Sequence, residues 1–171
     1  MSRNYSPSTR DRIGDLVTGM RIDTSTIAVA TYFDEADQNI FNLFGRIMIM
    51  ELYFEVVTTM GADACTLFFT YTSSTPVITV KPFSTVSVDD FANSDVGDRM
   101  NFVGGALTGV ATLSATECIG DEHCADPIMV GMENGIGTIG IDTVVAATSG
   151  TGYFSIHYVP MSDGAYVTAA L

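Results

Sequence analysis

One short segment, 118–126, gathers the side chains best suited to hold a metal ion: two cysteines, one histidine and three carboxylates. Structural zinc sites take four ligands, usually from two separate knuckles, whereas five residues separate Cys118 from Cys124 and no second knuckle follows. The glycine and carboxylate spacing of an EF-hand calcium loop is also missing. We therefore predict no metal and no other cofactor, and we interpret the segment as a polar surface loop. A disulfide between the two cysteines stays open as an alternative.

Groups that could catalyse a reaction are sparse in this chain. Nucleophilic catalysis needs a base beside a nucleophile, and only His123 and His157 offer an imidazole. The alternation around His157 is more typical of a surface or interface histidine. Glu51 and Glu55 share one face of a predicted strand, but roughly 13 Å apart, against the roughly 5 to 9.5 Å that a glycosidase pair needs. The sequence therefore predicts no catalytic residue and no enzyme activity.

Two glycine-rich segments, 103–109 and 134–140, have a superficial likeness to phosphate-binding loops. Their glycines are Gly104, Gly105, Gly109, Gly135, Gly137 and Gly140. Neither segment is followed by a helix or by the Lys and Ser/Thr pair of a P-loop, so we interpret them as turns, bulges or places of close backbone packing. Cys65, at the start of an apolar segment, is interpreted as a small core residue.

Charge is distributed unevenly along the chain. The formal net charge is -13, with 7 basic and 20 acidic residues, so the chain as a whole repels nucleic-acid phosphates and anionic lipids. Residues 1–21 nevertheless carry four arginines and two aspartates, a charge of +2 that leaves -15 for the remainder. We expect neither nucleic acid nor a membrane as a partner. The polar composition of the first ten residues is typical of a frayed terminus. The alternative is an extended arm that becomes ordered on a partner, in which Arg3, Arg10, Arg12 and Arg21 bind an acidic partner surface or a neighbouring subunit.

The elements that must position these groups are mostly extended. Strand-like alternation recurs roughly every ten to fifteen residues, with turn-forming residues between, and the long helical stretches of a parallel α/β domain are missing. We predict an all-β fold, an antiparallel sandwich or jelly-roll-like domain over residues 27–171, preceded by an extended N-terminal arm over residues 1–26. Sheets of this type have edges, which an oligomer can cover.

The predicted strands are 27–33, 46–59, 65–71, 77–83, 99–103, 110–113, 128–132, 137–141, 144–147, 153–159 and 165–169. The residues expected on the core face of the longest strand are Met48, Met50, Leu52, Phe54 and Val56. The next strand along the chain is expected to be its antiparallel partner. Pro82 places the fourth strand near an edge or an end, and the last two strands are expected to close the domain as a hairpin.

Two segments, FGRIMIMELYFEVVTTMGADACTLFFTY and GTGYFSIHYVPMSDGAYVTAA, resemble a family of small structural proteins of tailed bacteriophages. In that family, a Gly-Arg-hydrophobic strand that ends in a Val-Thr-Thr turn is paired with a terminal strand. The terminal strand reads hydrophobic-x-Tyr-x-Pro-Leu-x-x-Gly-Ala-x-Val, and Met161 stands here at the position of the leucine.

The resemblance implies a virion component, and in particular a capsid decoration (cement) protein that binds the outer capsid surface and stabilises the head. The expected partners are the major capsid protein and further copies of this chain, as a homotrimer or a homodimer. The expected location is the capsid surface, after synthesis in the host cytoplasm. The alternative is a phage tail or fibre component whose β-domain binds a carbohydrate or other ligand, with Tyr53, Tyr71 or Tyr153 as stacking platforms.

Overall fold

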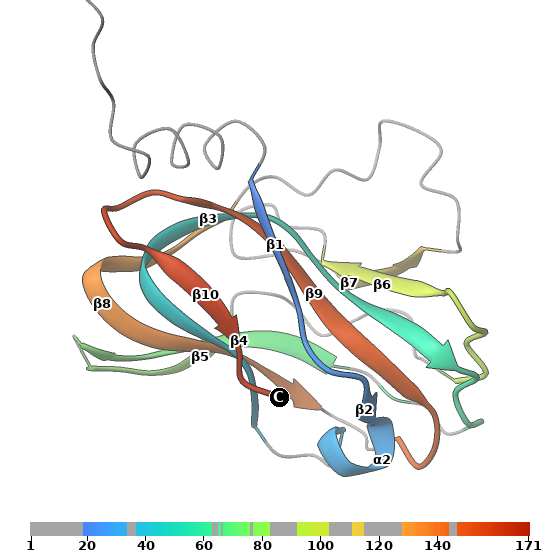
Figure 1. Ribbon diagram of the computed structural model, residues 1–171. Coiled ribbons are helices and arrows are strands. Elements are labelled where there is room, and N and C mark those ends of the chain that lie inside the picture. The colour runs from blue at the N-terminus through green and yellow to red at the C-terminus, as the bar shows by residue number, and fades with distance from the viewer. Residues whose placement is uncertain are drawn as a thin grey trace, which may run out of the picture.

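A computed structural model of the chain describes residues 19–33, 37–62, 65, 67–75, 77–82, 92–102, 111–114, 128–143 and 147–171. Within these residues the fold is almost wholly antiparallel β-sheet with one helical turn (Figure 1), which confirms the predicted all-β class. The elements are β1 (Met20–Asp23), β2 (Ile27–Ala28), α2 (Val29–Tyr32), β3 (Gln38–Thr58), β4 (Leu67–Thr75), β5 (Val77–Pro82), β6 (Arg99–Phe102), β7 (Ala111–Ser114), β8 (Ile128–Thr143), β9 (Thr151–Pro160) and β10 (Tyr166–Ala169).

The main strands pair in the order β1-β9-β3-β8-β4-β5, and the shorter strands pair at the sides of this path. β5 lies at one end of the order, which confirms the edge position predicted from Pro82, because proline cannot donate to a further strand. The predicted pairing of the long strand with its successor is wrong. β8 lies between β3 and β4, because β4 belongs to the opposite layer of the sandwich.

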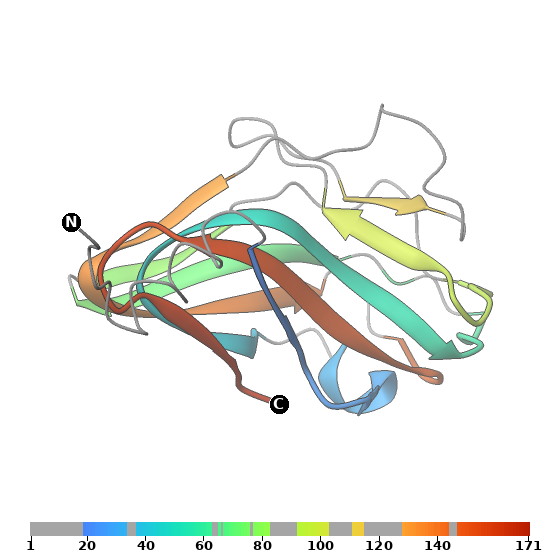
Figure 2. The same ribbon diagram turned by 45° about the horizontal axis from the view of Figure 1, so that its top comes forward.

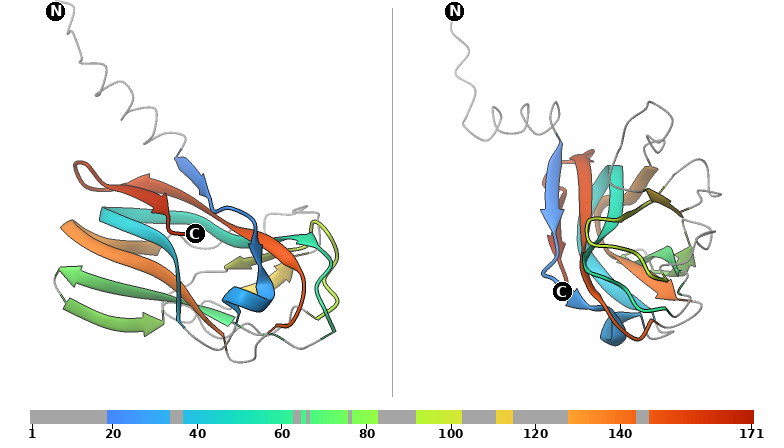
Figure 3. Two further views of the ribbon diagram at one scale, coloured as in Figure 1. Left: turned by 60° about the horizontal axis from the view of Figure 1, so that its bottom comes forward. Right: turned by 90° about the vertical axis from the view of Figure 1, so that its right-hand side faces the viewer.

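The sheet makes two layers because β3 and β8 both bend. The first half of β3 pairs with β10 and with the second half of β8, whereas the second half of β3 pairs with β9 and β6. Figure 3 shows the two halves of β3 running in different layers. This arrangement agrees with the predicted antiparallel sandwich, and the jelly-roll arrangement stays a prediction.

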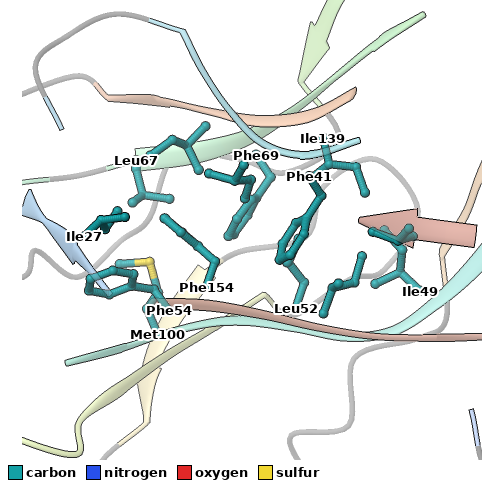
Figure 4. Packing of buried hydrophobic residues seen from close by; sticks show 14 of the residues in the cluster. Ile27, Phe41, Ile49, Leu52, Phe54, Leu67, Phe69, Met100, Ile139 and Phe154 are labelled. Atoms are coloured by element: carbon teal, nitrogen blue, oxygen red, sulfur yellow. The ribbon is translucent and has the colours of Figure 1, made fainter. Parts of the chain in front are cut away.

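Aromatic side chains from both layers fill the core (Figure 4). Phe54 of β3 lies 4.9 Å from Phe154 of β9, measured between ring centroids. Phe154 in turn lies 6.2 Å from Phe69 of β4, in the facing layer, with the two rings edge to face. All three rings are fully buried, and each such burial stabilises the fold by about 2 to 3 kcal/mol.

Only the first two residues of the predicted first strand, 27–33, form a strand, and the next four form the helical turn α2. The turn spaces Val29 and Phe33 four residues apart, so both side chains enter the core, and the Phe33 N–H donates to the Val29 carbonyl at 2.8 Å. The β-branched composition favours a strand, but burial of these two residues on one side of a turn outweighs that preference.

The predicted arm, 1–26, includes residues that belong to the sheet. β1 pairs antiparallel with β9 along its full length, from Met20 opposite Tyr158 to Asp23 opposite Ser155. β1 is thus an edge strand of the sheet, and its backbone groups pair with β9. Residues 1–18 lie outside the described part of the chain.

The core face of β3 changes halfway along the strand. Ile47 and Ile49 are buried whereas Met48 and Met50 are only half-buried, so the prediction of Met48 and Met50 as core residues is wrong. The register against β9 shifts between Ile49 and Glu51, which marks a β-bulge. The bulge adds one residue and therefore reverses which face is buried, and the predicted core residues Leu52, Phe54 and Val56 are confirmed beyond it.

The predicted closing hairpin is also wrong. β10 does not turn back onto β9 but runs in the same direction, and both strands pair antiparallel with β3. β9 ends with Pro160 opposite Ile47, and β10 begins with Tyr166 opposite Phe44. The chain between them follows the bend of β3, as Figures 1 and 2 show at one end of the molecule.

Candidate interaction surface

The bend of β3 is centred on Gly45, which has φ +77°. This left-handed conformation is costly for any residue with a Cβ. Both neighbouring strands insert extra residues beside it. On one side, β8 has four residues, 132–135, opposite the single residue Gly45 of β3. On the other side, the segment that joins β9 to β10 has five residues, 161–165, opposite Gly45 and Arg46. Longer outer segments let the sheet turn this corner without breaking its ladders.

Close contacts join the inserted segment 161–165 to the bend. The Arg46 backbone N–H donates to Ser162 Oγ at 2.9 Å, and the Met161 N–H donates to the Arg46 carbonyl at 2.8 Å. A Cβ at Gly45 would lie 2.8 Å from Ala165 Cβ, too close for an ordinary contact. On the other side, a Cβ at Gly131 of β8 would collide with the Gly45 carbonyl oxygen. The corner therefore requires glycine at both positions.

The outer face of the bend carries apolar side chains in two cross-strand rows. In the first row, Phe44 lies opposite both Tyr166 of β10 and Ile136 of β8, and the Phe44 and Tyr166 rings stack at 4.5 Å. In the second row, Met48 lies opposite Met129 of β8. Directly opposed residues share a face of the sheet, and this is the face away from the core. We call these five residues, together with Arg46 between the rows, the bend patch.

Exposure concentrates at this end of the molecule. Met129 is 58% exposed, Ile136 49% and Tyr166 44%, and the inserted segments add Met132 and Met161 at 42% and 43%. Single exposed apolar residues are ordinary, but a contiguous group of large ones marks an interaction surface. Within the part of the chain that the structure describes, no element covers this group.

Arg46 is the only cation among the bend-patch residues. The guanidinium forms no ion pair with a described residue, whereas Arg21 and Arg99 both do. Its neighbour across the strand, Gly131, has no side chain to crowd it. An unpaired arginine framed by methionine and aromatic residues matches the composition of protein interfaces.

A second cluster lies on the outer face of β1, β3 and β6, around Tyr53. Arg99 lies 4.8 Å and Arg21 5.7 Å from the Tyr53 ring centroid. Arg99 Nε donates to Glu55 Oε2 at 2.7 Å, and Arg21 Nε donates to Asp23 Oδ1 at 2.9 Å. These four charges neutralise one another in pairs, so the cluster holds strands together rather than presenting unmatched charge to a ligand.

The pKa shifts in this cluster follow from its pairing. Burial and the hydrogen bond to the Glu55 carboxylate raise the pKa of Tyr153 above its ordinary value. Burial alone would raise the pKa of Asp23, but interactions with the Ser155 hydroxyl and the Arg21 guanidinium outweigh it, so that pKa is lowered. Both shifts come from contacts within the fold, and neither group is poised to transfer a proton near neutral pH.

Of the four arginines predicted to bind a partner, the structure describes one. Arg3, Arg10 and Arg12 lie outside the described residues, and Arg21 belongs to the Tyr53 cluster. The segment with Cys118 and Cys124 is also outside them. Among the described residues, no three metal-ligating side chains gather.

Several individual predictions are settled by burial and packing. Cys65 is fully buried in the core, as predicted. The close backbone packing predicted for the second glycine-rich segment is confirmed, since a Cβ at Gly137 would lie 2.7 Å from the Thr72 carbonyl oxygen and one at Gly140 2.8 Å from that of Gln38. Tyr53 is only 2% exposed, so this ring cannot serve as the proposed carbohydrate platform.

Sequence reasoning did not find the bend patch. Its residues come from β3, β8 and β10, which no local pattern places side by side. The sequence offered one signal, its 9 methionines in 171 residues. This number indicates core or subunit contacts, but it does not show where on the molecule they lie.

Comparison with known proteins gives no family for this chain: no family model matches it, and no curated protein or solved structure is found to be similar. The helices of the described residues include none with the length and apolar character needed to cross a membrane.

Proposed function

We propose that this protein is a structural component of a tailed-bacteriophage virion, a capsid decoration (cement) protein that binds the outer capsid surface and stabilises the head. The bend carries the proposal, because the two segments that resemble the phage family meet there. Gly45 and Arg46 of the first segment contact Ser162 and Ala165 of the second. The two segments that carry the resemblance therefore form one structural feature, the bend, which supports the view that they belong to a single family pattern.

Other properties of the molecule suit attachment in many copies. Long hydrogen-bonded strands, 21 residues in β3 and 16 in β8, make a rigid module that needs no reacting groups. A net charge of -13 disfavours contact with nucleic acid, as suits a protein on the outside of a filled head. Weak contacts made by many copies on a lattice add up to firm attachment.

The capsid contact is assigned to the basic N-terminal segment. Arg3, Arg10 and Arg12 precede the first described strand. Arg21 lies in that strand with a side chain that is 51% exposed, but its charge is already paired with Asp23, so the contact is proposed for the first three arginines. Their positive charge complements an acidic capsid surface and contrasts with the -15 of the remaining chain.

Binding to capsids that lack the protein tests the proposal. The wild-type chain, a deletion of residues 2–18 and the triple variant Arg3→Gln, Arg10→Gln, Arg12→Gln are each mixed with such capsids, which are then sedimented and analysed for bound chain. We expect the wild type to bind in many copies and to raise the disruption temperature of the capsid, and both variants to bind less. A wild-type chain that does not bind contradicts the function. Unchanged binding of the deletion contradicts only the role of the segment.

A glycan array separates this function from the alternative tail or fibre role. Carbohydrate binding by the purified chain, combined with failure to bind capsids, would favour the alternative. Tyr71 and Tyr153, both half-buried, are the remaining candidate platforms for such a ligand.

A further inference from the structure

We propose that the bend patch binds a second copy of this chain, in a two-fold symmetric dimer in which the two patches face each other. The inference does not depend on the virion role, because it rests on the described surface alone. A dimer of this kind uses the same patch on both copies, so the patch must be complementary to itself in shape and charge.

The side chains of the patch have the composition of an interface core. Phe44, Met48, Met129, Ile136 and Tyr166 form two adjacent rows on one sheet face, and three of them are between 44% and 58% exposed. Interface cores are enriched in aromatic residues, methionine and arginine, and are depleted of lysine and acidic residues. Flexible methionine side chains adapt to an identical facing surface. Burying these rows removes apolar surface that the isolated chain leaves in water.

The charges around the patch are arranged to match a second copy. Arg46 lies between the two rows, opposite Gly131, and has no carboxylate partner among the described residues. Glu133 is exposed in the inserted segment 132–135, two residues beyond Gly131, where the positive φ of Asn134, 56°, shapes the turn. In a two-fold arrangement the central Arg46 of one copy meets the rim Glu133 of the other, and the pair forms twice.

Charge also favours a second copy over an arbitrary acidic partner at this surface. Two chains of net charge -13 repel each other, so they can associate only through a region that lacks excess negative charge. The bend patch is such a region: one cation at its centre, no acidic side chain within its rows, and a carboxylate at its rim.

Sedimentation velocity over a concentration series tests the proposal with a matched pair of variants. Met129→Glu places a charge within the patch, whereas Val96→Glu places the same charge at a 64% exposed apolar residue in the turn before β6. We expect a wild-type dimer, a rise of about 30-fold in the dissociation constant for Met129→Glu, and no change for Val96→Glu. Thermal melting of both variants, which change exposed residues, confirms that each is folded.

Charge reversal tests the cross-copy pair itself. Arg46→Glu and Glu133→Arg should each weaken the dimer about tenfold, and the double variant should restore it, because reversal of both charges recreates the pair. A wild-type chain that stays monomeric, a trimer in place of the dimer, or equal loss in Met129→Glu and Val96→Glu would overturn the proposal. Failure of the double variant to recover would overturn the assigned pairing.

Discussion

The Arg46 backbone N–H donates a hydrogen bond to Ser162 Oγ at 2.9 Å, across 116 residues of sequence. This contact fixes the point where β3 turns from one layer of the sandwich to the other and where β9 gives way to β10. The same corner carries the proposed dimer surface on its outer face.

Gly45→Ala should destabilise the protein by about 3 kcal/mol, because the new Cβ is forced both into a left-handed conformation and against Ala165. Gly164→Ala is the matched control, since Gly164 has a similar φ of +72° but nothing within 4 Å of its added Cβ. This control should cost only about 1 kcal/mol. Chemical unfolding measures both free energies, and equal losses would show that the corner is not tightly packed.

Truncation of two adjacent residues tests the change of core face along β3. Ile47→Ala should cost about 3 kcal/mol because Ile47 is fully buried, whereas Met48→Ala should cost less than about 1 kcal/mol. The difference in the free energy of unfolding between the two variants is the readout. A larger loss for Met48→Ala would mean that the opposite face of β3 packs in the core.

Tyr158→Phe tests a buried polar contact between β9 and β10. The Val167 backbone N–H donates to the Tyr158 hydroxyl at 3.1 Å, and both residues are buried. Removal of the hydroxyl leaves that N–H without its acceptor, so we expect a loss of about 2 kcal/mol. Tyr166→Phe, at an exposed tyrosine, should change stability by less than about 0.5 kcal/mol. Similar values for the two variants would contradict the contact.

Two aspartates should respond to pH with opposite signs. The pKa of Asp23 is lowered in the fold, so its charge contributes stability above the unfolded value of about 3.8, and that stability is lost as the pH falls through the lower folded pKa. Burial, followed by the nearby charge of Asp37, raises the pKa of Asp142, so its charged form opposes folding at neutral pH. That penalty disappears as the pH falls through the raised folded pKa and is gone below about 3.8.

At pH 7, therefore, Asp23→Asn should lower the melting temperature slightly and Asp142→Asn should raise it slightly. Both differences should vanish toward pH 2. Thermal melts of the two variants and the wild type across this pH range provide the comparison, and differences that persist at pH 2 would show that charge is not the cause.

The fold class and several strands could be predicted from the sequence, because apolar and polar residues alternate along a strand wherever one of its faces is exposed to solvent. Leu52 to Val56 is such a stretch, and its core face was predicted correctly. From Ile47 to Met50 every residue is apolar, so the pattern could not reveal a bulge that reverses the faces.

Pairing between distant segments was harder to predict. The Gly164–Ala165 sequence resembles a hairpin turn, yet it continues the chain around the corner, because the bend at Gly45 is a property of a strand more than a hundred residues earlier. The bend patch depends on the same long-range pairing, and for that reason its residues could not be grouped from the sequence.

If the proposed function holds, a phage genome encodes this chain, and electron cryo-microscopy of the particles of that phage tests the proposal most directly. We predict density for this β-sandwich at repeated lattice positions on the outer capsid surface, with neighbouring copies joined through their bend patches. Particles that contain no copy of the chain, or that carry it only at the tail, would contradict the proposed role in the head.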